Sequence, residues 1–151
     1  LLSETAEIRD TDVVSHVLVP SQNAVLVYSC SMDETFSKVV SDTVLRTDGT
    51  PAKVYPEIFY MLDALHGLED YNKVVASYAD GRIYIVVAQG RSLCLCNSFE
   101  AADFVTAEYF IFHVLKKLQL NPEVTVIYFR TPLAEDEEMS LYKYFKAVDY
   151  I

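Results

Sequence analysis

The stretch KVVASYADGRIYIVVAQGRSLCLCNS, residues 73–98, contains three strand-like runs joined by very short turns. β-Branched and aromatic residues are concentrated in these runs, as is typical of strands. Asp80-Gly81 separates the first two runs, and these residue types accept the positive φ angles of a two-residue type I′ hairpin turn. Gln89-Gly90 separates the second run from the third. The stretch therefore predicts a three-stranded antiparallel meander.

The residues before the meander predict a hairpin, two helices and a short strand. Two apolar runs, residues 13–19 and 24–30, are separated by the turn formers Pro-Ser-Gln-Asn. A Ser with a Glu three residues later is a capping box, which predicts a helix over residues 32–44. Residues 52–55 are a short strand candidate, and the proline that follows suits the first turn of a helix over residues 56–65.

After the meander the apolar residues recur with the helical period over residues 103–119. Residues 124–129 (VTVIYF) predict a strand covered on both faces, and Thr131-Pro132 precedes a last helix. Residues 147–151 are a terminal strand candidate. We expect an α/β fold with a mixed sheet centred on the meander, extended by the strand at 124–129, and covered by the helices at 103–119 and 32–44.

Length and charge restrict the class of protein. A chain of 151 residues has the size of one domain, and its 52% hydrophobic content is sufficient for a packed core. The net charge of −10 disfavours binding to nucleic acids and to anionic membrane surfaces. No apolar run approaches the length of a membrane span. We expect a cytoplasmic location, and the start at Leu1 suggests a piece of a longer protein.

Metal and nucleophile motifs are weak in this chain. The histidines have no metal-ligand spacing, and neither a Walker loop nor a Gly-x-Ser-x-Gly elbow occurs. Cys94 and Cys96 are two residues apart in a strand-like run. We expect them to be reduced and buried by packing, with a redox or metal role as the alternative. The sequence predicts no catalytic and no metal-ligating residues.

From about Val13 to Ile151 the chain resembles the C-terminal half of a bacterial family of uncharacterised proteins with an actin-like ATPase, ribonuclease H-like fold. The resemblance is best at Gln89-Gly90-Arg91, at LCNSF from Leu95, at Asp103-Phe104, and at LQLNP from Leu118. In such proteins an "NSF…DF" turn leads from the third meander strand into a helix that ends in "LxLxP". The resemblance implies that residues 1–151 form one actin-like lobe of a longer two-lobed protein.

The resemblance also identifies where a nucleotide would bind. Active members of the actin-like superfamily have an acidic residue and a Gly-Gly-x-Thr type turn between the first two meander strands, where backbone N–H groups hold phosphate. This chain has Asp80, Gly81 and Arg82 there, with one glycine and no hydroxyl pair. These three residues are the candidates for cofactor binding only if the chain binds Mg-ATP.

Two functions from different classes follow. The first is a non-catalytic actin-like scaffold or protein-interaction domain that has degenerate phosphate loops, binds no cofactor, and associates with a protein partner or with itself. The alternative is a nucleotide-binding ATPase lobe that needs the missing N-terminal half to complete its cleft. The loss of the glycine and hydroxyl pattern around Gly81 favours the non-catalytic domain.

Overall fold

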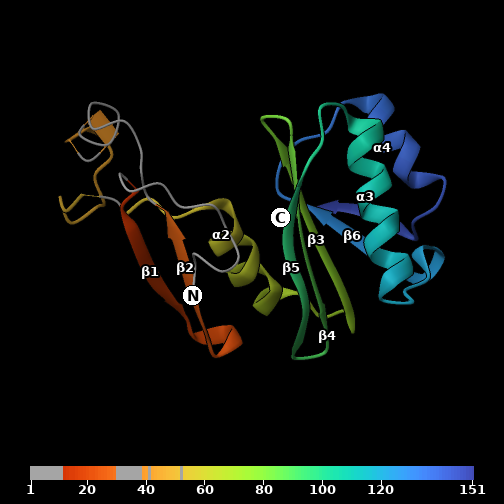
Figure 1. The fold of residues 1–151 in the computed structure, drawn as a ribbon, viewed down its shortest axis with the longest axis horizontal. Helices are drawn as coiled ribbons and strands as arrows, with labels where there is room; N and C mark the ends of the chain where they lie inside the picture. The colour runs from red at the N-terminus through yellow and green to blue at the C-terminus, as the bar shows by residue number, and fades with distance from the viewer. Residues whose placement is uncertain (1–11, 30–38, 41, 52) are drawn as a thin grey trace. The chain divides into compact units, whose positions relative to one another are not determined.

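The computed structural model describes residues 12–29, 39–40, 42–51 and 53–151, which form two compact units (Figure 1). The first unit comprises residues 1–56 and the second comprises residues 57–151. In the first unit, β1 (Val14–Val19) and β2 (Ala24–Ser29) form an antiparallel hairpin across the 3-10 turn η2 (Pro20–Gln22). The hairpin predicted at residues 13–30 is thus confirmed for its described residues.

Two other predictions fall in the first unit. The start of the helix predicted at residues 32–44 lies outside the described residues, and residues 39–40 and 42–43 are helical. The strand predicted at residues 52–55 is wrong for its described part, because residues 53–55 adopt no regular structure. An isolated antiparallel bridge between Leu45 and Pro51 precedes this segment.

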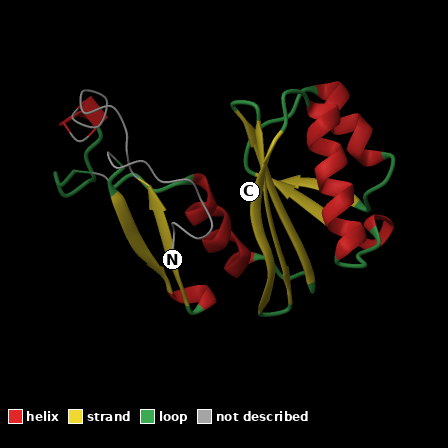
Figure 2. Cartoon of the chain, viewed as in Figure 1, coloured by secondary structure: helices red, strands yellow, loops and turns green. Residues whose placement is uncertain are grey.

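The second unit contains a five-stranded mixed sheet, drawn in yellow in Figure 2, with the strand order β5-β4-β3-β6-β7. Its strands are β3 (Asn72–Ala79), β4 (Arg82–Gln89), β5 (Ser92–Glu100), β6 (Val126–Phe129) and β7 (Ala147–Tyr150). β3, β4 and β5 form the predicted antiparallel meander. β6 lies between β3 and β7 and is parallel to both. The mixed sheet centred on the meander is confirmed.

Helices cover both faces of this sheet (Figure 1). On one face lie α3 (Phe104–Lys117) and α4 (Glu135–Tyr142), and on the other lies α2 (Glu57–Ala64), which continues as η3 (Leu65–Gly67). A short turn, η4 (Pro122–Val124), leads into β6. The sequence interpretation named residues 32–44 as a second covering helix, and most of that segment lies outside the described residues. α2 packs against β3 and β4.

The main core lies between the sheet and the α3/α4 layer. Buried side chains from alternate positions of β3, β4 and β6 meet those of α3 and α4 there. This cluster includes Val74, Ala76, Ile83, Ile85, Val87, Ile127 and Phe129 from the sheet, with Ala107, Ile111, Val114, Leu115 and Leu141 from the helices. Met61, Leu62 and Leu65 are buried on the α2 side. Burial on both faces explains why β3 and β4 are apolar at successive positions.

The motifs that carry the family resemblance perform structural roles at the ends of α3. Asp103 is the N-cap, and its carboxylate accepts a hydrogen bond from the backbone N–H of Thr106 at 2.8 Å. Hydrogen bonds from Thr106 lower the pKa of Asp103. After the helix, Leu120 is buried and the Asn121 side chain accepts from the N–H of Glu123 at 3.1 Å. These residues fix where α3 begins and where the next turn starts.

Two local features set the register of the meander. Asp80 and Gly81 have φ angles of 52° and 68°, as the predicted type I′ turn requires, and Ala79 therefore pairs with Arg82. In the β4–β5 pair the register shifts, since Val87 pairs with Leu95 whereas Ala88 pairs with Leu93. Cys94 is the extra residue of this β-bulge.

We predict that Gly81→Val lowers the free energy of unfolding by about 1–3 kcal/mol, because a β-branched residue is strained at positive φ. Urea denaturation measures the loss. Gly67→Val is the matched control, since Gly67 lacks a positive φ and a Cβ there would meet nothing within 4 Å. Equal stability of the two variants would show that the turn does not constrain the meander.

Candidate functional site

The residues that the sequence nominated for phosphate binding lie together at one end of the sheet. Asp80 and Gly81 are exposed in the β3–β4 turn, and Arg82 is the first residue of β4. This is the end at which the parallel strands β3, β6 and β7 finish. Ligands of open α/β sheets commonly bind at such a carboxyl edge. We define the candidate site as this edge on the face covered by α2.

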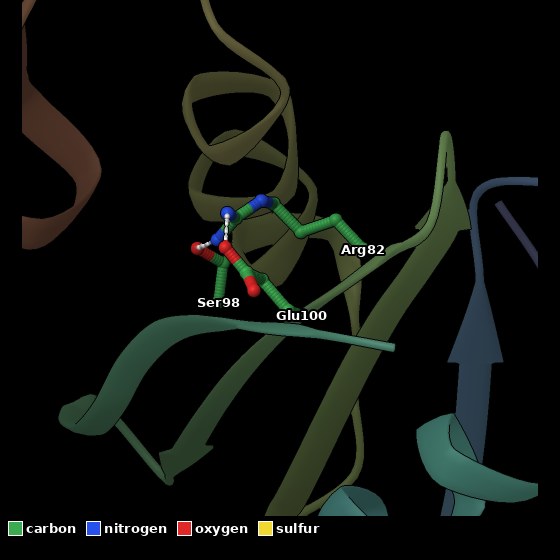
Figure 3. Close-up of polar contacts among 3 residues, drawn as sticks. All are labelled: Arg82, Ser98 and Glu100. Carbon is green, nitrogen blue, oxygen red and sulfur yellow. Dashed lines mark hydrogen bonds and ion pairs between the residues drawn. The ribbon is translucent and has the colours of Figure 1, made fainter. Parts of the chain in front are cut away.

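The cationic group of the site, Arg82, is held by its neighbours on β5 (Figure 3). Its Nη1 donates to Ser98 Oγ at 3.2 Å, and its Nη2 lies 3.3 Å from Glu100 Oε1. The strand register explains the ion pair, because Arg82 and Glu100 are directly opposite each other on β4 and β5. The guanidinium charge is therefore compensated by a carboxylate within the sheet.

A second arginine at the same edge is compensated in the same way. Arg130 follows β6, and its Nε lies 2.8 Å from Glu57 Oε1 at the start of α2. Its guanidinium carbon also lies 5.3 Å from the centre of the Tyr60 ring. The side chains of Arg130 and Glu57 are only 28% and 30% exposed. This pair is better shielded from solvent than the Arg82–Glu100 pair, and it attaches α2 to the sheet.

Two hydroxyl side chains near this edge, those of Thr131 and Ser77, are engaged in the fold or buried. Thr131 Oγ1 accepts a hydrogen bond from the backbone N–H of Tyr78 at 2.9 Å. Ser77 is fully buried, and its Oγ has no hydrogen-bond partner in the described part of the chain. The hydroxyl of Ser77 is therefore not accessible to a ligand in solution.

Hydrogen bonds and a ring contact also hold the β3–β4 turn against the segment around Ala101. The backbone N–H of Ala101 donates to Gly81 O at 2.8 Å, and the Tyr78 hydroxyl donates to Ala101 O at 3.3 Å. The Tyr78 ring makes an edge contact with Phe104, with ring centres 5.6 Å apart. These contacts join the β3–β4 turn to the segment that connects β5 with α3. They give Gly81 a structural role that needs no ligand.

The charges of the site disfavour an anionic ligand. Asp80, Glu100 and Glu57 carry negative charge, whereas Arg82 and Arg130 carry positive charge, and each arginine is paired with a glutamate. Asp80 remains as an exposed carboxylate in the turn itself. Phosphate would meet a net negative group of side chains in a protein of net charge −10.

The sequence predicted three of the residues at this edge and missed four others, namely the second arginine and three residues that contact the two arginines. The missed residues are Glu57, Ser98, Glu100 and Arg130. Without a bulge, the pairing of Gln89 with Ser92 at the β4–β5 turn would place Phe99 opposite Arg82. The bulge at Cys94, which the sequence does not signal, places Glu100 there instead. The Glu57–Arg130 pair joins segments 73 residues apart and has no local signal.

The described residues have two free thiols on β5 but no cluster of metal ligands and no helix that could span a membrane. They contain no group of three or more potential metal-ligating side chains. Cys94 and Cys96 are free thiols, and the expectation that they are buried is wrong, because both residues are exposed on β5. Partial burial of the thiol itself raises the pKa of Cys96. Among the described helices, none is both long and apolar enough to cross a membrane.

A separate polar contact on β6 joins Tyr128 to the segment before β3. The Tyr128 hydroxyl donates to Asp70 Oδ2. Desolvation, followed by the hydrogen bond and the charge of Asp70, raises the pKa of Tyr128 to about 12. The folded protein therefore holds this proton more tightly than an ordinary tyrosine side chain does.

Comparison with known proteins identifies a family and a fold. The model of a family described as "Protein of unknown function (DUF3822)" matches residues 1–148. None of the curated proteins compared with the chain matches it. A crystal structure from Bacteroides thetaiotaomicron VPI-5482, described as a protein with an actin-like ATPase fold and unknown function, is similar with a TM-score of 0.68 and 21% sequence identity. The similarity covers 98% of this chain and 57% of that one. The actin-like fold expected from the sequence is confirmed.

We predict that Arg130→Met lowers the free energy of unfolding by about 1–3 kcal/mol, because it leaves the partly buried Glu57 without its cation. Arg82→Met is the matched comparison, and its exposed ion pair predicts a loss below about 1 kcal/mol. Urea denaturation at low and high salt measures both losses. A larger loss in Arg82→Met would contradict the difference in shielding between the two pairs.

The raised pKa of Tyr128 predicts a pH-dependent contribution to stability. Because the folded pKa lies above that of the unfolded chain, the contribution is complete below pH ~10 and is lost as the pH rises toward 12. Tyr128→Phe should therefore cost about 1–2 kcal/mol near neutral pH and progressively less above pH ~10. Urea denaturation from pH 7 to 11.5 tests this, with the exposed Tyr71→Phe as control. A cost that stays constant with pH would refute it.

Proposed function

The chain belongs to the DUF3822 family, and we propose that it is a non-catalytic, actin-like scaffold or protein-interaction domain. The observation that carries the proposal is the state of Arg82. This residue is the one cation among the three nominated for phosphate contact, and Glu100 already compensates its charge. A phosphate group would have to displace a carboxylate that the register of the sheet holds opposite Arg82.

Exposed apolar side chains on the α3/α4 side support a role in protein interaction. Val105 is 74% exposed and Tyr109 is 62% exposed, one helical turn apart on α3. Phe112 follows on the same side of the helix, and its ring contacts that of Tyr144 with centres 5.1 Å apart. Tyr144 is itself 51% exposed. Aromatic side chains of this kind are enriched in protein interfaces.

We also propose that the chain is part of a longer two-lobed protein of the bacterial cytoplasm. The similar actin-like structure is considerably longer, and this chain spans 57% of its length. The two exposed free thiols of β5 are suited to a reducing compartment. The five-stranded unit, residues 57–151, would then be the core of one lobe.

The alternative function is a nucleotide-binding ATPase lobe. It is favoured by one observation, the position of Asp80-Gly81 in the turn between the first two meander strands of an actin-like fold. In that case Asp80, Gly81 and Arg82 would contact Mg-ATP, and Arg82 would have to leave Glu100 on binding.

Thermal unfolding with and without Mg-ATP separates the two functions. We predict no shift in the melting temperature, whereas a ligand at 100 times its Kd would add ~2.7 kcal/mol of stability. Glu100→Gln is informative because it releases Arg82 from its partner, and Glu123→Gln makes the same charge change at an exposed position outside the sheet. We predict that wild type and Glu123→Gln both fail to bind.

A clear rise in melting temperature with Mg-ATP in the wild type, abolished by Arg82→Met, would reverse the ranking. Binding only in Glu100→Gln would support the view that the ion pair closes the site. The Gly81→Val variant adds a further distinction. If Gly81 is structural, this variant is destabilised. If Gly81 instead contacts phosphate, the variant loses ATP binding while its stability is nearly unchanged.

A further inference from the structure

The outer edge of β5 differs from the other edge of the sheet. β5 has nine residues and, within the described part of the chain, pairs only with β4. β7, at the opposite edge, has four residues and carries the exposed Asp149. Proteins commonly protect sheet edges with short strands, charges or proline, because an open edge can pair with another strand. β7 has two of these protections.

The part of β5 that pairs with β4 without a bulge has no charged side chain before Glu100. From Leu95 to Glu100 its pairing with β4 is uninterrupted, and the bulge residue Cys94 lies just before this segment. The residues from Ser92 to Phe99 include neither a charged residue nor a proline. In a chain of net charge −10, this uncharged strip is a place where two like-charged molecules can approach each other.

We propose that the outer edge of β5 pairs antiparallel with β5 of a second copy of this chain, through residues 95–99. This arrangement is self-complementary. A two-fold axis that relates antiparallel strands keeps equivalent side chains on the same face, so residues of like parity lie opposite each other. With the axis at Asn97, the centre of the segment, Leu95 of each copy lies opposite Phe99 of the other. Both side chains are partly buried against the α3/α4 core, and the contact continues that apolar layer.

The charges that flank β5 favour the same arrangement. Arg91 is exposed before the strand and Glu100 is exposed at its end. With the axis at Asn97, antiparallel pairing places Glu100 of one copy opposite Cys94 of the other, so Glu100 and Arg91 lie toward the same end of the contact but are not directly opposite each other. Parallel pairing would instead place like charges together.

The size of the contact predicts its strength. A pairing of five residues on each side is a small interface, so we expect a reversible dimer with a dissociation constant on the order of 10 μM. The dimer goes beyond the proposed function, because it would form whether or not Mg-ATP binds. The thermal unfolding experiment and the association experiment can therefore fail independently.

Sedimentation equilibrium of the full chain from 1 to 200 μM tests for the dimer. We predict that Asn97→Lys raises its dissociation constant at least tenfold, because two lysines would lie opposite each other at the axis. Val124→Lys is the control, since Val124 is 65% exposed and lies outside the sheet. Melting temperatures establish that both variants are folded. A monomer throughout the concentration range, or a dimer unaffected by Asn97→Lys, would overturn the proposal.

Cysteine cross-linking tests the register separately. In a chain with Cys30, Cys94 and Cys96 changed to serine, single cysteines are placed at positions 96, 97 and 98. The residue on the two-fold axis lies opposite itself, so Asn97→Cys should give the most disulfide-linked dimer under mild oxidation. Val124→Cys measures random cross-linking. Cross-linking at positions 96–98 no greater than at position 124 would show that the edges do not pair.

Discussion

The pairing of β3 with β4 is the constraint on which the rest of the second unit depends. The turn at Asp80 and Gly81 fixes this register, and it directs Ile83 and Ile85 to the α3/α4 core. β5 then adds to the free side of β4, and β6 adds to the free side of β3. Because side chains alternate between faces, a slip of one residue in this pair would exchange the core and α2 faces of one strand relative to the other.

The sequence predicted regular elements better than the contacts between them. The meander, α3, β6 and β7 have local signals in composition, period and capping, and they lie where expected. The bulge at Cys94 has no such signal, yet it decides that Phe99 faces the core opposite Ile83 and that Glu100 faces Arg82. Prediction of the site was limited for the same reason. Asp80, Gly81 and Arg82 were nominated from the family resemblance, at a turn that Asp80-Gly81 predicts. The contacts of the two arginines depend on a register irregularity and on the docking of α2, which is a tertiary contact.

The candidate site combines the framework of an actin-like sheet with arginines that are already paired with carboxylates. The hairpin turn, the carboxyl ends of the parallel strands and the covering helix are all present. The difference lies in side chains, since each arginine at the edge contacts a glutamate from a neighbouring element. Such pairs stabilise the packing of β5 and α2 on the sheet, and they use the positive charges that phosphate recognition requires. In this chain the two ion pairs occur within an actin-like fold, and a fold alone does not fix an activity.

In this mixed topology the strands of the sheet cannot all pair at the same stage of synthesis. The meander joins neighbouring segments, so its hydrogen bonds can form as soon as residues up to Glu100 have emerged from the ribosome. β3 acquires its second neighbour only when β6 emerges, from Val126 onward, and β7 follows later still. In the nascent chain the central strand of the finished sheet is thus an edge strand, with buried residues such as Val75 and Ala76 beside an unpaired backbone. The early appearance of α2 and α3, which precede β6 in the chain, allows both faces of that strand to be covered before its edge is closed.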